Sequence, residues 1–149
     1  MRYQLTDEWQ LMANADWEDW SQFSDNLLSV QGGVLNPQAA LDREWKDTWK
    51  AGIAASRHLG NKIYSMGLSY DSSPVSDSKR TIDLPMDNQI KLSAAMGIQG
   101  TERLSYALGT TLMYAGEGKV DQTAQGVRFK GKFDTNLILF VGATARYVY

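Results

Sequence analysis

The chain has 149 residues, enough for one small domain, and its 15 basic and 17 acidic residues leave a formal net charge of −2. Because these charges are scattered, they form no basic footprint for nucleic acid, and we expect no nucleic-acid partner. The lack of cysteine excludes disulfides and thiolate sites, and a zinc site or a Ser-His-Asp triad would depend on His58 alone. We therefore expect no enzyme, no cofactor and no metal. No apolar run approaches the roughly 20 residues of a membrane-spanning helix, which excludes a helical membrane protein.

The first predicted strand is a stub at residues 1–5, and a turn at 6–8 leads to a second strand at about 9–20. One face of this second strand is apolar and carries Trp9, Leu11, Ala13, Ala15 and Trp17. Such period-two alternation is typical of a β-strand with two unlike faces. Residues 21–43 predict a loop with at most a short helix near Pro37–Leu41, since they contain Gly and Pro punctuation. A third strand is predicted at about 47–57, with a turn at 59–61.

The second half of the chain continues this order of strand, turn, strand and loop. The clearest alternation is at 62–71, where one apolar face carries Tyr64, Met66, Leu68 and Tyr70. Further strands are predicted at 90–99, 104–115 and 136–149, with a turn at 100–103 and loops at 72–87 and 116–131. The last strand alternates without a break and ends on an aromatic residue, Tyr149.

The connections alternate between short and long, which is typical of the periplasmic turns and extracellular loops of an outer-membrane barrel. Aromatic residues lie toward both ends of the apolar face, which predicts two girdles at the membrane interfaces. The members are Trp9, Tyr64, Tyr106, Tyr147 and Tyr149 toward the short turns, and Trp17, Trp49, Tyr70 and Tyr114 toward the long loops. We predict an all-β fold, an antiparallel up-and-down meander of about six full strands plus a stub, as part of a transmembrane outer-membrane β-barrel.

A different class of protein has a similar pattern. A small soluble β-barrel that binds an apolar ligand also has antiparallel strands with one apolar face. In that alternative, Tyr64, Met66 and Leu68 face a closed interior and Ser65 and Gly67 face water. The small residues opposite the apolar face also have two interpretations, because glycines there provide either space for a substrate or relief of strain where the sheet curves.

Ordered sequence pieces across nearly the whole chain carry a family resemblance. The segment from Trp9 ends in the pattern Trp17-x-x-Trp20-Ser21-x-Phe23. The pieces that follow in order are Trp45–Trp49, Gly67–Val75, Leu84–Asn88, Leu92-Ser93, Gly116–Gly118 and Gly131–Phe133. This ordered set resembles the FadL-type long-chain fatty acid transporters of the outer membrane.

The resemblance implies a barrel of about fourteen strands with an amino-terminal hatch, located in the outer membrane and passing hydrophobic compounds such as fatty acids. We expect residues 1–149 to be the carboxyl-terminal portion of a single β-barrel domain, a fragment without the signal peptide, hatch and earlier strands. The expected partners are the lipid bilayer, hydrophobic small molecules, and the barrel-assembly machinery, which would act through the strand ending at Tyr149.

Strand parity selects the candidate binding residues. A fatty acid presents a carboxylate and an apolar tail, so its site requires a cation beside an apolar wall. The lumen-facing candidates by parity are Lys50, Lys91 and Arg146 as cations, and Met113 and Phe140, together with Ile138, as apolar residues. The alternative for these cations is ion pairing with Asp16, Glu18 or Asp71 inside a polar lumen.

Overall fold

The computed structural model describes residues 1–23, 44–80, 85, 87–124 and 126–149. Its main element is a single antiparallel sheet of seven strands in the order β1-β2-β3-β4-β5-β6-β9. The strands of this sheet are β1 Arg2–Gln4, β2 Trp9–Glu18, β3 Thr48–Leu59, β4 Lys62–Asp71, β5 Gln89–Gln99, β6 Leu104–Tyr114 and β9 Leu137–Tyr147. This confirms the predicted meander of six full strands and a stub.

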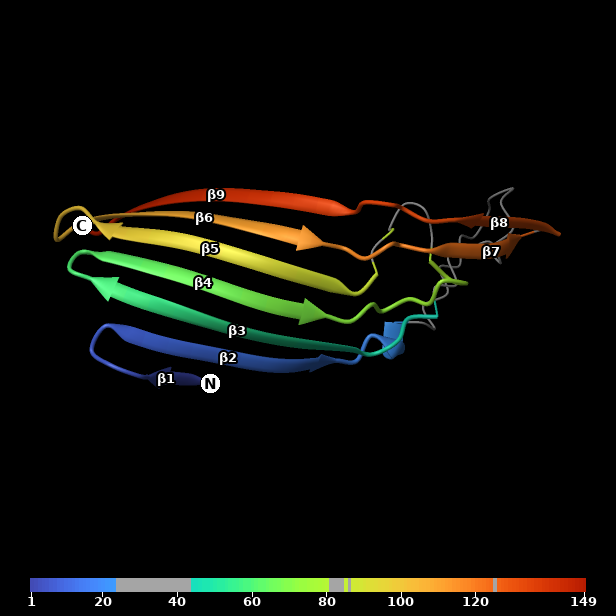
Figure 1. Ribbon diagram of the computed structural model, residues 1–149, viewed down its shortest axis with the longest axis horizontal. Coiled ribbons are helices and arrows are strands. Elements are labelled where there is room, and N and C mark those ends of the chain that lie inside the picture. The colour runs from blue at the N-terminus through green and yellow to red at the C-terminus, as the bar shows by residue number, and fades with distance from the viewer. Residues whose placement is uncertain (24–43, 81–84, 86, 125) are drawn as a thin grey trace.

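The six full strands have 10 to 12 residues each. A tilted strand needs roughly 9–11 residues to cross the hydrocarbon core of a bilayer. Figure 1 shows the strands side by side in one layer, with the short turns and the carboxyl terminus at one end and the long connections at the other. The predicted alternation of short and long connections is therefore confirmed for the described part of the chain.

Two of the short turns are built in the same way around a threonine. The Thr6 hydroxyl accepts hydrogen bonds from the backbone N–H of Glu8 at 3.3 Å and of Trp9 at 3.0 Å. The Thr101 hydroxyl likewise accepts from the N–H of Arg103 at 3.3 Å and of Leu104 at 3.1 Å. A side-chain oxygen that satisfies two turn amides stabilises a tight reversal of the chain.

The turn between β3 and β4 depends on glycine. Leu59 pairs directly with Lys62, which leaves only Gly60 and Asn61 to reverse the chain. Gly60 has a φ of 59°, a conformation that is unfavourable for residues with a Cβ.

The register divides the sheet into two unlike faces. The face that we call the outward face carries aligned rows such as Ala13, Ile53, Leu68, Leu92, Leu112 and Leu139. The opposite face, which we call the lumen face, carries rows such as Asn14, Gly52, Ser69, Lys91, Met113 and Ile138. On the outward face, Ile53 and Leu139 are each 65% exposed, so large apolar side chains point away from the sheet with no protein layer over them.

The hydrophobic side chains that are buried lie mostly at the loop end and not at the centre of the sheet. Among the described residues they are Val75, Met113, Ala115 and Val120. Val75 and Val120 belong to long connections, and the other two are at the end of β6 and just after it. The protein-only core is therefore a small loop assembly, whereas the sheet has large apolar surface on its outward face.

Several predictions of boundaries and loops differ from the structure. The region 116–131, predicted as a loop, contains a separate hairpin of β7 Val120–Ala124 and β8 Val127–Gly131. Its strands have five residues each, too short for the periodicity to stand out. β2 ends at Glu18 because Trp20 N–H turns back to the Glu18 carbonyl at 3.1 Å. A short 3-10 helix, Ser21–Phe23, follows, and the predicted helix near 37–41 lies outside the described residues.

Candidate functional site

Three of the five predicted site residues lie together on the lumen face. Lys91 is paired in register with Met113, and Met113 is paired with Ile138 on β9. Phe140 lies opposite Thr111, one row further toward the short turns. Directly paired residues in an antiparallel sheet have Cα atoms about 4.5–5.5 Å apart, so Lys91 and Met113 are immediate neighbours. Phe140 is a diagonal neighbour of Met113, at a spacing of about 7–8 Å that large side chains can bridge.

The lysines of the lumen face are ion-paired, as the alternative interpretation predicted. Lys50 Nζ lies 2.5 Å from Glu18 Oε1, and Lys91 Nζ pairs with Asp71 Oδ2. Asp71 is also in register with Lys50 across β3 and β4. The result is a row of alternating charge, Glu18, Lys50, Asp71 and Lys91, that crosses four strands below the long loops.

Arg146 lies apart from these lysines. It pairs in register with Ser105, next to the short turn between β5 and β6. Lys50 and Lys91 are at the third residue of β3 and β5, which is the opposite end of the sheet. The structure therefore does not bring Arg146 into the cluster of Lys91, Met113 and Phe140.

The glycines of the lumen face differ in the space around them. A Cβ added to Gly52 would lie 2.6 Å from Asn14 Oδ1, so Asn14 already occupies that space. A Cβ added to Gly142 meets nothing within 4 Å. Gly142 is on β9, at the edge of the sheet, and its partner across the sheet is Gly109, so the space beside it belongs to this edge and does not by itself indicate a ligand site.

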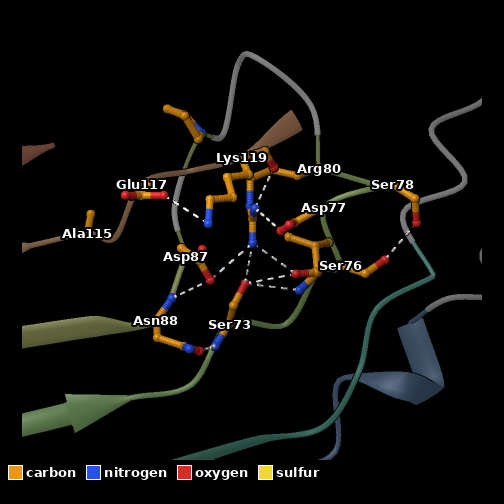
Figure 2. A network of polar contacts seen from close by, with 12 residues as sticks. Ser73, Ser76, Asp77, Ser78, Arg80, Asp87, Asn88, Ala115, Glu117 and Lys119 are labelled. Atoms are coloured by element: carbon orange, nitrogen blue, oxygen red, sulfur yellow. Dashed lines mark hydrogen bonds and ion pairs between the residues drawn. The ribbon is translucent and has the colours of Figure 1, made fainter. Parts of the chain in front are cut away.

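Above the lumen-face row, a polar network joins the long connections; it contains residues that sequence reasoning missed (Figure 2). At its centre, Arg80 is 1% exposed although it lies in a loop. Its guanidinium donates to Asp77 Oδ1 at 2.7 Å and to the Lys119 carbonyl at 2.6 Å. We call the described residues 72–80, 85, 87–88 and 115–119 the cap.

The cap is closely packed around two glycines with positive φ. Gly116 has φ 67°, and a Cβ there would lie 2.3 Å from Asp87 Cβ. Gly118 has φ 51°, and a Cβ there would lie 2.2 Å from the Pro85 carbonyl oxygen. Both contacts require glycine for its conformation and for its lack of a side chain. The sequence analysis used the Gly-x-Gly pattern at 116–118 only for the family resemblance, although two glycines at this spacing are also a signal for close backbone approach.

The β7–β8 hairpin extends beyond the cap (Figure 1). Arg128 and Asp121 form a two-point ion pair, with Nε–Oδ1 at 2.8 Å and Nη2–Oδ2 at 2.7 Å. The hydrogen bond from Arg128 lowers the pKa of Asp121 below its ordinary value of 3.8. The Lys119 ammonium similarly lowers the pKa of Glu117. The charged form of these two carboxylates is thus favoured.

A groove of about 640 Å³ lies on the outward face and is lined almost entirely by apolar atoms of residues such as Tyr3, Leu11, Ile53, Met66 and Leu92. Because it is on the outward face, we assign it to contact with hydrocarbon and not to the lumen. Within the described ranges, no group of three or more His, Cys, Asp or Glu side chains is arranged to hold a metal. In the same ranges, no helix is long and apolar enough to cross a membrane.

Comparison with known proteins places this geometry in a family. The chain is 22% identical over 143 residues to a long-chain fatty acid transport protein of Escherichia coli O6:H1, covering 95% of this chain and 31% of that protein. A protein of the same name from Salmonella typhi is 23% identical over 134 residues, covering 87% and 30%. The chain thus spans about a third of the length of the curated relatives it matches.

A solved structure shows the same fold. The crystal structure of a Pseudomonas aeruginosa FadL homologue superposes with a TM-score of 0.83 at 21% sequence identity, over 98% of this chain and 34% of that one. The family model for outer membrane protein transport proteins (OMPP1/FadL/TodX) matches residues 1–149. Membership of this family favours lipid, and not a closed interior, next to the outward face. The chain belongs to the OMPP1/FadL/TodX family of outer-membrane transport proteins.

Proposed function

We propose that this chain forms the carboxyl-terminal part of the wall of an outer-membrane barrel that takes up long-chain fatty acids or related hydrophobic compounds. Residues 1–149 are then one portion of a single barrel domain, whose other strands would pair with the free edges at β1 and β9. Unpaired edges are not tolerated in hydrocarbon, which supports this proposal. The barrel-assembly machinery is a proposed partner through the last strand, up to Tyr149.

The observation that carries this proposal is the cluster of Lys91, Met113 and Phe140 on the lumen face. Met113 is 5% exposed and Phe140 is 52% exposed, so the apolar wall has both a covered and an open part. Lys91 is held by Asp71 at the edge of this wall. A fatty-acid carboxylate would compete with Asp71 for the Lys91 ammonium while the acyl chain contacts Phe140, whose neighbour Met113 is the covered part of the wall.

Uptake of a radiolabelled long-chain fatty acid by the full-length transporter, in cells that lack their own, tests this. We expect Lys91→Met to raise the half-saturating concentration about tenfold, with a smaller effect on the maximal rate, since one charge-assisted contact is lost. Asp71→Asn removes the competitor and should lower the half-saturating concentration several-fold. The matched control is Arg146→Met, which removes a lumen-face cation outside the cluster.

A fatty alcohol of the same chain length separates the two parts of the site. Its uptake should be insensitive to Lys91→Met, because it has no carboxylate. Equal half-saturating concentrations for unmodified protein and Lys91→Met, with the fatty acid, would show that this cluster is not the site.

A further inference from the structure

The Arg80 side chain joins connections that are far apart in the sequence. Besides Asp77 and the Lys119 carbonyl, its guanidinium contacts the Val75 carbonyl at 3.2 Å, Ser73 Oγ at 3.4 Å and Asp87 Oδ1 at 3.2 Å. The acceptors belong to the β4–β5 connection and to the segment that follows β6. A fully buried guanidinium is stable only when its donors are satisfied, so these connections must stay together for Arg80 to remain buried.

The cap also continues directly into the strands of the candidate site. Ser73 follows Asp71 by two residues, and its N–H donates to Asn88 Oδ1 at 2.9 Å, just before β5. Asp87 N–H donates to the Ala115 carbonyl at 2.9 Å, just after β6. Figure 2 shows Asp77, Asp87 and Ser73 bonded to Arg80, and the Ser73–Asn88 bond next to them. One side chain therefore ties together the outer ends of the strands that carry Asp71, Lys91 and Met113.

Burial shows that the outer end of the lumen face is covered. Met113 points to the lumen face and is 5% exposed, and Ala115, just after β6, is 0% exposed. Tyr114, between them in the sequence and on the outward face, is 40% exposed. At this end of β6 the lumen-face side chain is therefore covered and the outward one is open, and Asp87 and Asn136 bond to the nearby Ala115 carbonyl.

We propose that Arg80 is a positioning residue for uptake: it holds the cap over the outer end of the lumen-face cluster and thereby keeps Met113 covered and the Asp71–Lys91 pair in place. This role rests on the proposed function for its effect on uptake, but the state of the cap can be measured without a substrate. Loss of Arg80 should loosen the cap, expose its buried residues to water and weaken the apolar wall of the site.

The test uses the full-length transporter in whole cells, with any cysteines outside this chain replaced. This chain contains no cysteine, so Val75→Cys, at a residue 5% exposed within the cap, adds a single reporter. Its labelling rate with a membrane-impermeant maleimide reports opening of the cap. Arg80→Met is compared with Arg128→Met, which removes an arginine whose side chain is 63% exposed in the neighbouring hairpin.

We expect Arg80→Met to speed labelling at least about tenfold, because a buried charge network is opened. It should also raise the half-saturating concentration for fatty acid about five- to tenfold, with the maximal rate changed much less. Arg128→Met should leave both quantities as they are. Retained heat-modifiable migration on gels shows that the barrel itself is intact.

Other outcomes overturn the proposal. Unchanged labelling would show that Arg80 does not hold the cap, and faster labelling with an unchanged half-saturating concentration would show a purely structural role. If Arg80→Met fails to assemble, Asp87→Asn is the second test, because it removes one negative charge from around Arg80 and keeps the other acceptors. A moderate rise in both quantities supports the proposal, and no rise overturns it. Failure of the unmodified protein to take up fatty acid would overturn the proposed function. The comparison of labelling rates between variants tests only the role of Arg80 in the cap.

Discussion

The sheet and the cap are stabilised by opposite means. In the sheet, backbone hydrogen bonds join the strands and the outward side chains lie open, with Met66 64% and Val141 69% exposed. In the cap, a charged side chain is the most buried large group, and close backbone contacts at glycines surround it. The sheet depends on hydrocarbon to cover it, whereas the cap is closed by its own polar contacts. In this fold, close packing of the kind found in soluble proteins therefore occurs in the loops, outside the hydrocarbon region, and not on the outward face of the sheet.

We expect the greatest loss of stability from a charged residue placed on the outward face. Ala94 faces outward between Met66 and Thr110, and Ala95 faces the lumen between Ser65 and Gly109. We expect Ala94→Lys to destabilise the full barrel by about 2–4 kcal/mol, the cost of a charge on the lipid face near mid-depth. Ala95→Lys, one residue further on, should cost much less. Reversible unfolding in urea from lipid vesicles measures both, and equal losses would contradict the assignment of the faces.

A smaller effect tests the close packing of the cap. Gly118→Ala places a Cβ on the Pro85 carbonyl oxygen at a positive φ, whereas Gly126 has a φ of 79° with nothing within 4 Å of its added Cβ. Each substitution costs about 1 kcal/mol for the backbone conformation, and only Gly118→Ala adds a clash. We expect maleimide labelling of Val75→Cys to rise strongly with Gly118→Ala and little with Gly126→Ala. A labelling rate that rises no more with Gly118→Ala than with Gly126→Ala would show that the cap accommodates the added Cβ at Gly118 without loosening.

We expect the smallest change from the exposed ion pair between Asp121 and Arg128 in the β7–β8 hairpin. The folded-state pKa of Asp121 is lowered by Arg128, so the ion pair contributes stability above the ordinary pKa of 3.8 and loses it as the pH falls through the lowered value. Proteolysis of the hairpin, measured at each pH relative to an unstructured peptide substrate, should be constant from about pH 5 to 8 and increase only in stronger acid. Asp121→Asn should remove this acid dependence, and a transition near neutral pH would contradict the assignment.

Much of the sheet could be predicted because period two is a local property. Tyr64, Met66, Leu68 and Tyr70 identify both the strand and its outward face, and the observed β4 has the predicted bounds 62–71. The pairing of Lys91 with Asp71 was also within reach, since both have lumen parity next to the same long connection. The separation of Arg146 from Lys91 could also have been predicted, because Arg146 lies near a short turn. The candidates were selected by strand parity only, which gives the face of the sheet and not the position along the strand.

The cap could not be predicted in the same way. Arg80 lies among serines and aspartates in a segment that reads as a solvated loop, and its acceptor on Lys119 is 39 residues away. The hairpin at 120–131 was missed for a related reason, because short exposed strands carry little periodicity. Contacts of this kind depend on which loops meet in space, which no local pattern of residues contains.

From the sequence alone followed the strands of the seven-stranded sheet, their two faces, the order of short and long connections and the family, because alternation and ordered motifs are local properties of the chain. Only the tertiary structure decided that Lys50 and Lys91 are paired, that Lys91, Met113 and Phe140 are neighbours, and that Arg80 is buried under the joined loops. The physical reason is that the register and loop contacts are set by backbone hydrogen bonds and charge burial between distant segments, whose partners are selected when the sheet assembles.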